Sequence, residues 1–114
     1  MNNLSDYFRN LGGLHDARVL DLRWNYAGKC FSIEIDDLHS NEAGEQDYCG
    51  PSQAVIVCTG ISKLLIEVDF GLDGLMIYDW VISQSSGHGY SCEVKFSPAG
   101  RVIFQCGSIE VVKE

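Results

Sequence analysis

The feature that most constrains the fold of this chain is an alternation of apolar and polar residues with a period of two. It recurs from Ala17 to the C-terminus, and the clearest run, from Phe31 to Asp36, alternates Phe, Ile and Ile with Ser, Glu and Asp. Successive side chains on a strand point to opposite faces of the sheet, so this alternation places one face in an apolar core and the other in water. The pattern predicts a domain built mainly from antiparallel strands.

Turn residues divide the alternating pattern into about eight segments. The predicted strands are Ala17–Asn25, Cys30–Asp36, Ala54–Thr59, Leu64–Phe70, Leu75–Ile82, Tyr90–Phe96, Arg101–Cys106 and Ile109–Val112. The first two form a hairpin, the third is apolar on both faces and is predicted to be central, and the last is predicted to be an edge strand. Strands at this spacing favour a meander, a curled sheet or an open barrel.

The first segment has the only clear helical pattern. Leu4, Tyr7, Phe8 and Leu11 recur at the spacing of one helix face, and two glycines follow. So short a helix needs its apolar stripe docked on the sheet, because isolated helices of this length are marginal in water. The expected fold class is mainly β (α+β): a short N-terminal helix packed on a curled antiparallel sheet or open barrel of about eight strands. At 114 residues, one domain spanning 1–114 is expected.

The net charge of the chain argues against some classes of binding partner. The chain carries a net charge of −8 and only eight lysines and arginines. Binding to nucleic acid or to an anionic membrane depends on clustered basic residues, so neither partner is expected. An acidic surface can instead attract a basic protein, or it can simply keep the protein soluble. The N-terminus has no signal-peptide pattern and no apolar run is long enough to span a bilayer, so a cytoplasmic protein is expected.

The five cysteines favour a reduced protein. None forms a Cys-x-x-Cys pair, and Cys92 and Cys106 fall in phase with apolar strand residues. A free thiol in such a position behaves as a small hydrophobe, so we expect core thiols and no disulfide framework or zinc site. Cys49 is the exception, because it stands beside Gly50 and Pro51 in a predicted loop.

The long polar segment from Asp37 to Ser52 is the leading candidate for a protein-binding surface. It carries four acidic residues, Asp37, Glu42, Glu45 and Asp47, and no lysine or arginine. A loop of this length in a small domain is usually either functional or disordered. The alternative is a solvated insertion without a partner.

The strand predicted at Leu75–Ile82 supplies a second candidate. Its alternation places Tyr78 and Trp80 in phase with Met76 and Ile82 on one face. Aromatic side chains with a polar tip suit a half-buried face and are also enriched among interface anchors. Tyr78, Trp80 and Tyr90 are therefore the candidate lining of a pocket inside the curled sheet. Such a pocket would make the chain a small-ligand binder or an enzyme.

His15 and Asp16 are adjacent, and neighbours on an extended strand point to opposite faces. We therefore expect no catalytic dyad, and instead hydrogen bonds from one or both side chains to backbone groups where the first strand begins. His15, His39 and His88 have no ligand spacing, and no nucleophile motif is present, so no catalytic residue, metal or cofactor is predicted.

Four short segments carry a resemblance to a known class of protein. They are Leu14-His15-Asp16-Ala17 before an alternating strand, Phe31-Ser32-Ile33-Glu34-Ile35, Gly60-Ile61 between two strands, and Gly100-Arg101-Val102-Ile103-Phe104. Together they resemble small bacterial β-rich proteins, some of which are classed as immunity proteins of polymorphic toxin systems. The resemblance implies a non-enzymatic cytoplasmic protein that binds and blocks a toxin, and the acidic surface would suit a basic nuclease toxin. The expected function is a non-enzymatic acidic protein-binding module.

Overall fold

The computed structural model describes residues 4–40, 46, 48, 50–69, 74–84 and 89–113. Its elements, in chain order, are α1 (Leu4–Asn10), the 3-10 turn η1 (Gly12–Leu14), β1 (Val19–Asn25), β2 (Cys30–Ile35), β3 (Ala54–Thr59), β4 (Lys63–Glu67), β5 (Met76–Gln84), β6 (Tyr90–Ser97), β7 (Arg101–Cys106) and β8 (Ser108–Lys113). None of the helices in this part of the chain is long and apolar enough to cross a membrane.

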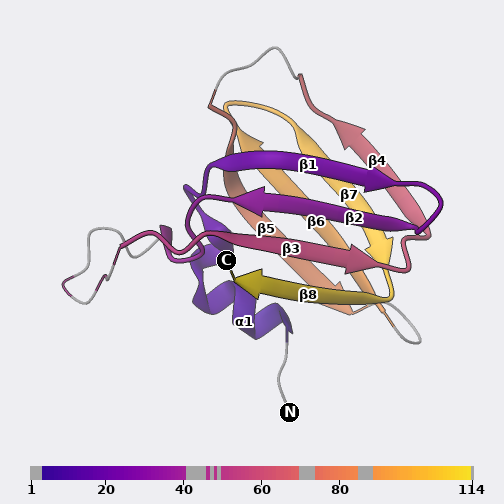
Figure 1. Ribbon diagram of the computed structural model, residues 1–114, viewed down its shortest axis with the longest axis horizontal. Coiled ribbons are helices and arrows are strands. Elements are labelled where there is room, and N and C mark those ends of the chain that lie inside the picture. Colours follow the sequence, from indigo (N-terminus) through magenta and orange to yellow (C-terminus); the bar gives the residue numbers. More distant parts are fainter. Residues whose placement is uncertain are drawn as a thin grey trace.

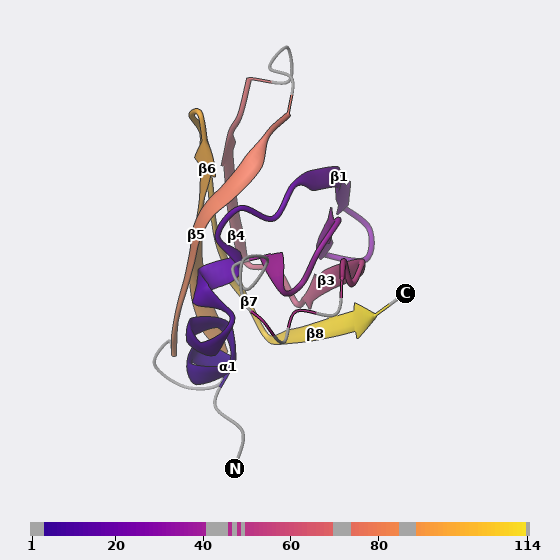
Figure 2. The same ribbon diagram turned by 90° about the vertical axis from the view of Figure 1, so that its left-hand side faces the viewer.

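The eight strands form two four-stranded antiparallel sheets. Sheet 1 has the order β1-β2-β3-β8 and sheet 2 the order β4-β7-β6-β5. In Figure 1 the strands of sheet 1 cross in front of those of sheet 2, and Figure 2 shows the two layers from the side. The predicted mainly β fold of about eight antiparallel strands is confirmed. The strands are shared between two sheets, neither of which closes into a barrel.

The chain passes between the two sheets at two glycines that lie against each other. Gly60 follows β3 and Gly107 follows β7, and the amide of Gly107 donates a hydrogen bond of 2.8 Å to the carbonyl of Thr59. A Cβ on Gly60 would lie 3.2 Å from the Gly107 nitrogen, and Gly60 has a φ of +70°. Glycine allows both the left-handed conformation and this close approach. The crossings let β8 pair with β3, so β3 is central and β8 is an edge strand, as predicted.

The core lies between the inner faces of the two sheets, and α1 closes one side of it (Figure 2). Phe31 of β2 and Phe104 of β7 meet across the layers, with ring centroids 5.6 Å apart. Phe8 of α1 is fully buried and stacks on Trp80 of β5. The predicted helix stripe is thus docked on the sheet through Phe8 and Leu11, both buried.

A bulge in β5 changes which side chains face the core. The pairing of β5 with β6 shifts between Ile77 and Asp79, so Tyr78 is an extra residue in the strand. Ile77 and Trp80 are buried, whereas Tyr78 is 55% exposed. The prediction that Tyr78 and Trp80 share one face is therefore wrong, because an inserted residue reverses the alternation of side chains.

Candidate functional site

The first residue of the predicted acidic surface is a structural residue. Asp37 is buried, and its carboxylate accepts hydrogen bonds of 3.0 Å from the backbone amides of His39 and Ser52 and a third from the hydroxyl of Tyr48. Burial raises the pKa of the Asp37 carboxyl, but the three hydrogen bonds outweigh it and hold that pKa below its ordinary value. Asp37 thus ties the two ends of the segment 37–52 together. Glu42, Glu45 and Asp47 lie outside the described residues.

The three aromatic residues of the predicted pocket do not line a common cavity. Trp80 is buried between Phe8 and Phe104, Tyr78 is exposed, and Tyr90 is half-buried at the start of β6. Tyr78 instead borders a shallow depression of about 740 Å³, which also involves Lys95 and Arg101. The space between the sheets at Trp80 is filled by aromatic rings.

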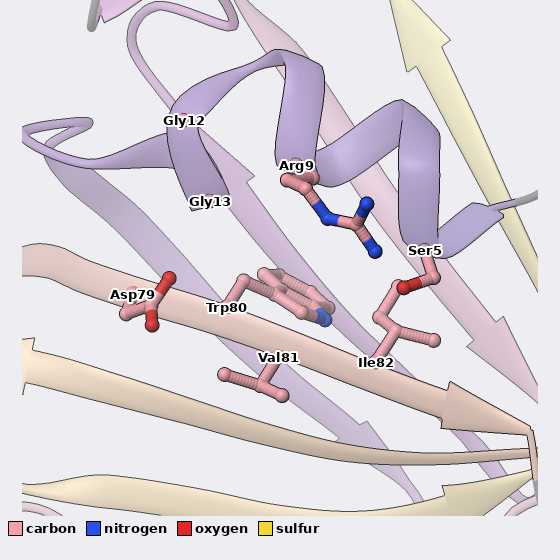
Figure 3. A pocket seen from close by; sticks show the side chains of 8 residues that line it. All are labelled: Ser5, Arg9, Gly12, Gly13, Asp79, Trp80, Val81 and Ile82. Atoms are coloured by element: carbon pink, nitrogen blue, oxygen red, sulfur yellow. The ribbon is translucent and has the colours of Figure 1, made fainter.

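A second hollow, of about 460 Å³, lies between α1 and β5 (Figure 3). Ser5 and Arg9 border it on the helix side and Asp79 to Ile82 on the strand side. The Arg9 guanidinium is already paired with Asp6 at 3.1 Å. The indole N–H of Trp80 is buried and has no hydrogen-bond partner among the described residues, but it has almost no accessible surface. Of the two charged side chains that border the hollow, Arg9 is engaged by Asp6, and Asp79 stands alone, so the described residues do not supply the several converging polar groups that orient a small ligand.

His15 and Asp16 lie together, contrary to the expectation from an extended backbone. Asp16 has a φ of +72° and Leu14 a φ of +60°, so the backbone around His15 is left-handed. His15 Nε2 lies 3.4 Å from Asp16 Oδ1. His15 Nδ1–H donates a hydrogen bond of 2.8 Å to the carbonyl of Tyr78, which supports the expected structural role of His15. Both side chains are about half exposed, at 48% and 59%.

Three thiols lie in the core, as predicted for Cys92 and Cys106. Cys58 comes from sheet 1 and the other two from sheet 2, and all three are buried. Hydrogen bonds with Cys106, followed by burial, raise the pKa of the Cys58 and Cys92 thiols. Cys49 lies outside the described residues. Nowhere in ranges 4–40, 50–69, 74–84 and 89–113 do three or more His, Cys, Asp or Glu side chains form a metal-binding group.

The outer face of sheet 1 has an apolar centre that the sequence pattern hinted at only in β3. Two rows of paired residues cross the four strands, one of Asp21, Glu34, Val55 and Val112, the other of Arg23, Ser32, Val57 and Glu110. Val55 and Val57 are half-buried and Val112 is 41% exposed. No other described helix or strand lies over this face (Figures 1 and 2).

Charge distinguishes this face from the outer face of sheet 2. The two rows on sheet 1 hold three carboxylates and one guanidinium, and Arg23 is bonded to Asp21 at 2.6 Å. Glu34 and Glu110 therefore remain beside the valines without a basic partner in these rows. On sheet 2 the two corresponding rows are Glu67, Arg101, Lys95, Asp79 and Leu65, Ile103, Glu93, Val81. They hold three carboxylates and two bases, and Arg101 lies within ion-pair distance of both Glu67 and Glu93.

Neither the models of known protein families nor the curated proteins include a match to this chain.

Proposed function

We propose that this protein is a non-enzymatic protein-binding module that contacts a basic partner through the outer face of sheet 1. The contact surface, here called the valine–glutamate face, consists of Val55, Val57, Val112, Glu34 and Glu110. The observation that carries the proposal is the uncovered cluster of three valines, Val55 and Val112 in one row and Val57 in the next, with Glu34 and Glu110 beside them. An apolar centre with a charged border is the usual anatomy of a protein interface.

The apolar centre contributes binding affinity, and the charges increase the association rate and select a basic partner. Covering the three valines removes apolar area from water, which stabilises a complex by about 25 cal/mol per Å² before the costs of association. Glu34 and Glu110 favour a partner with lysines or arginines opposite them, and the net charge of −8 accelerates its approach. An uncovered sheet face suits a protein partner better than a small molecule, which needs a concave site.

The resemblance to immunity proteins of toxin systems suggests that the proposed partner is a toxin. A cytoplasmic toxin that acts on nucleic acid carries a basic surface, and an acidic protein bound there would block access to the phosphates. In this proposal the protein uses no catalytic residue and no cofactor. The alternative of a small-ligand binder with a pocket between the sheets receives no support from the aromatic residues that fill the space around Trp80.

The test is the association of the purified protein with a basic toxin domain encoded beside its gene, followed at two salt concentrations. The double variant Glu34→Lys/Glu110→Lys should associate roughly tenfold more slowly than wild type at low salt, because the local attraction is reversed. Val57→Ala should instead accelerate dissociation, since it trims the apolar centre and leaves the charge unchanged.

The matched control is Glu67→Lys/Glu93→Lys on the outer face of sheet 2, which changes the net charge by the same amount. It should slow association much less, because only long-range attraction is lost. Equal slowing by both double variants, together with an unchanged dissociation rate for Val57→Ala, would exclude the valine–glutamate face as the contact surface.

A further inference from the structure

The left-handed turn that precedes β1 is held in place from several sides. The amide of Asp16 donates a hydrogen bond of 2.9 Å to the carbonyl of Ile77, and the amide of Ala17 donates one of 3.0 Å to the carbonyl of Leu14. Leu14 is fully buried, and Ser40 Oγ donates a hydrogen bond of 2.8 Å to the carbonyl of His15. Non-glycine residues at positive φ persist only where the surrounding structure fixes them, and they are frequent at functional sites. The turn presents His15 and Asp16 side by side at the surface.

The hydrogen bond of His15 determines which of its nitrogens is available. A carbonyl can only accept, so Nδ1 carries the proton in the contact with Tyr78. In the neutral imidazole Nε2 then has a free lone pair, and it is the nitrogen beside Asp16 Oδ1. Histidines that bind metals nearly always donate their other N–H to a carbonyl or carboxylate, which fixes the ring in this way.

The distance between the two side chains fits a shared metal ion better than a short hydrogen bond. Nε2 and Oδ1 are 3.4 Å apart. A charge-assisted N–H···O bond is about 2.7–2.9 Å long. In a tetrahedral zinc site with ligand bonds of about 2.1 Å, two ligand atoms lie about 3.4 Å apart.

We propose that His15 Nε2 and Asp16 Oδ1 form a two-point binding site for a divalent transition-metal ion of the zinc class. Imidazole with carboxylate suits zinc, cobalt and nickel, whereas magnesium and calcium prefer oxygen alone. The described residues contribute no third protein ligand, so water occupies the remaining positions. Both side chains are half exposed, and the strongly acidic chain attracts a cation to this surface.

The test is an NMR titration of the full-length protein with Zn²⁺, following the imidazole signals of His15. Zn²⁺ should shift these signals saturably, Mg²⁺ should leave them unchanged, and paramagnetic Co²⁺ should broaden signals around His15 and Tyr78 before others. Asp16→Asn should weaken the Zn²⁺ response at His15 by roughly tenfold or more. Asparagine accepts a positive φ as aspartate does, so this variant keeps the turn.

Asp21→Asn is the control, because it removes one negative charge from β1, the strand that follows the turn, and leaves His15 unchanged. It should bind Zn²⁺ at His15 as wild type does. The proposal is overturned if Zn²⁺ leaves the His15 signals unmoved, or if Asp16→Asn responds like the Asp21→Asn control. In either case the two side chains serve only to hold the turn.

Discussion

Phe8 of α1 stacks on Trp80 of β5, with ring centroids 5.1 Å apart and ring planes 25° apart. This contact joins the helix to sheet 2 and covers the indole, which is 3% exposed. The helix has only seven residues and depends on such packing for its stability.

Phe8→Ala should therefore destabilise the protein by about 3–5 kcal/mol, the usual cost of removing a buried aromatic ring. Urea denaturation followed by tryptophan fluorescence measures both the loss and the exposure of Trp80. Tyr7→Ala on the same helix is the control and should cost about 1 kcal/mol or less, because Tyr7 is already partly exposed. Equal costs for the two variants would contradict the role of the stacked pair.

Asp37 should make stability depend on pH. Its pKa is lower in the folded protein than in the unfolded chain, so its contribution is fully present above about pH 4 and is lost as pH falls through the folded pKa. Urea denaturation between neutral and acid pH should show that the free energy of unfolding falls less on acidification in Asp37→Asn than in wild type.

Tyr48→Phe should also make stability less sensitive to acid, but by less than Asp37→Asn, because it removes only one of the three hydrogen-bond donors to the Asp37 carboxylate. Glu110→Gln, at an exposed residue of β8, is the control for general charge effects. If the free energy of unfolding of Asp37→Asn falls on acidification as much as that of wild type, other carboxyls are responsible for the acid sensitivity.

The thiols should react in an order set by burial. Cys30 is half-buried, whereas Cys58, Cys92 and Cys106 are buried. Alkylation requires an accessible thiolate, so Cys30 should be modified before the three core thiols. Mass spectrometry after brief alkylation of the native protein measures the order. Modification of Cys58 or Cys92 at the rate of Cys30 would show that the core is open.

Gly13→Ala should cost more than Gly74→Ala, although both glycines have nearly the same positive φ, +64° and +68°. A Cβ on Gly13 would lie 2.2 Å from Asp79 Oδ1, whereas nothing lies within 4 Å of one on Gly74. Gly74→Ala should cost about 1–2 kcal/mol from backbone strain alone. Gly13→Ala should add about 1–3 kcal/mol from overpacking.

Adding Asp79→Ala to Gly13→Ala should recover part of the difference, since it removes the atom in closest contact. Thermal or urea denaturation of the three variants measures these costs. If Gly13→Ala costs no more than Gly74→Ala, the Asp79 side chain moves aside freely.

Much of the strand layout could be predicted from the sequence. The bounds of Ala54–Thr59 and Arg101–Cys106 agree with β3 and β7, because alternation and turn residues are local properties of the chain. The candidate sites were harder to predict. The bulge at Tyr78 arises where β5 pairs with β6, and burial of Asp37 depends on Tyr48 and Ser52, which lie more than ten residues along the chain.

The sequence by itself determined that this chain forms antiparallel strands with a docked N-terminal helix, since side-chain periodicity decides which residues can face a common core. Only the tertiary structure decided that the strands divide into two sheets, because the pairs β3–β8 and β4–β7 join segments far apart in the chain. It also brought His15 and Asp16 together and aligned Val55, Val57 and Val112 on one face. Backbone handedness at a single residue and strand register across a sheet are set by contacts with distant segments, which a local pattern does not contain.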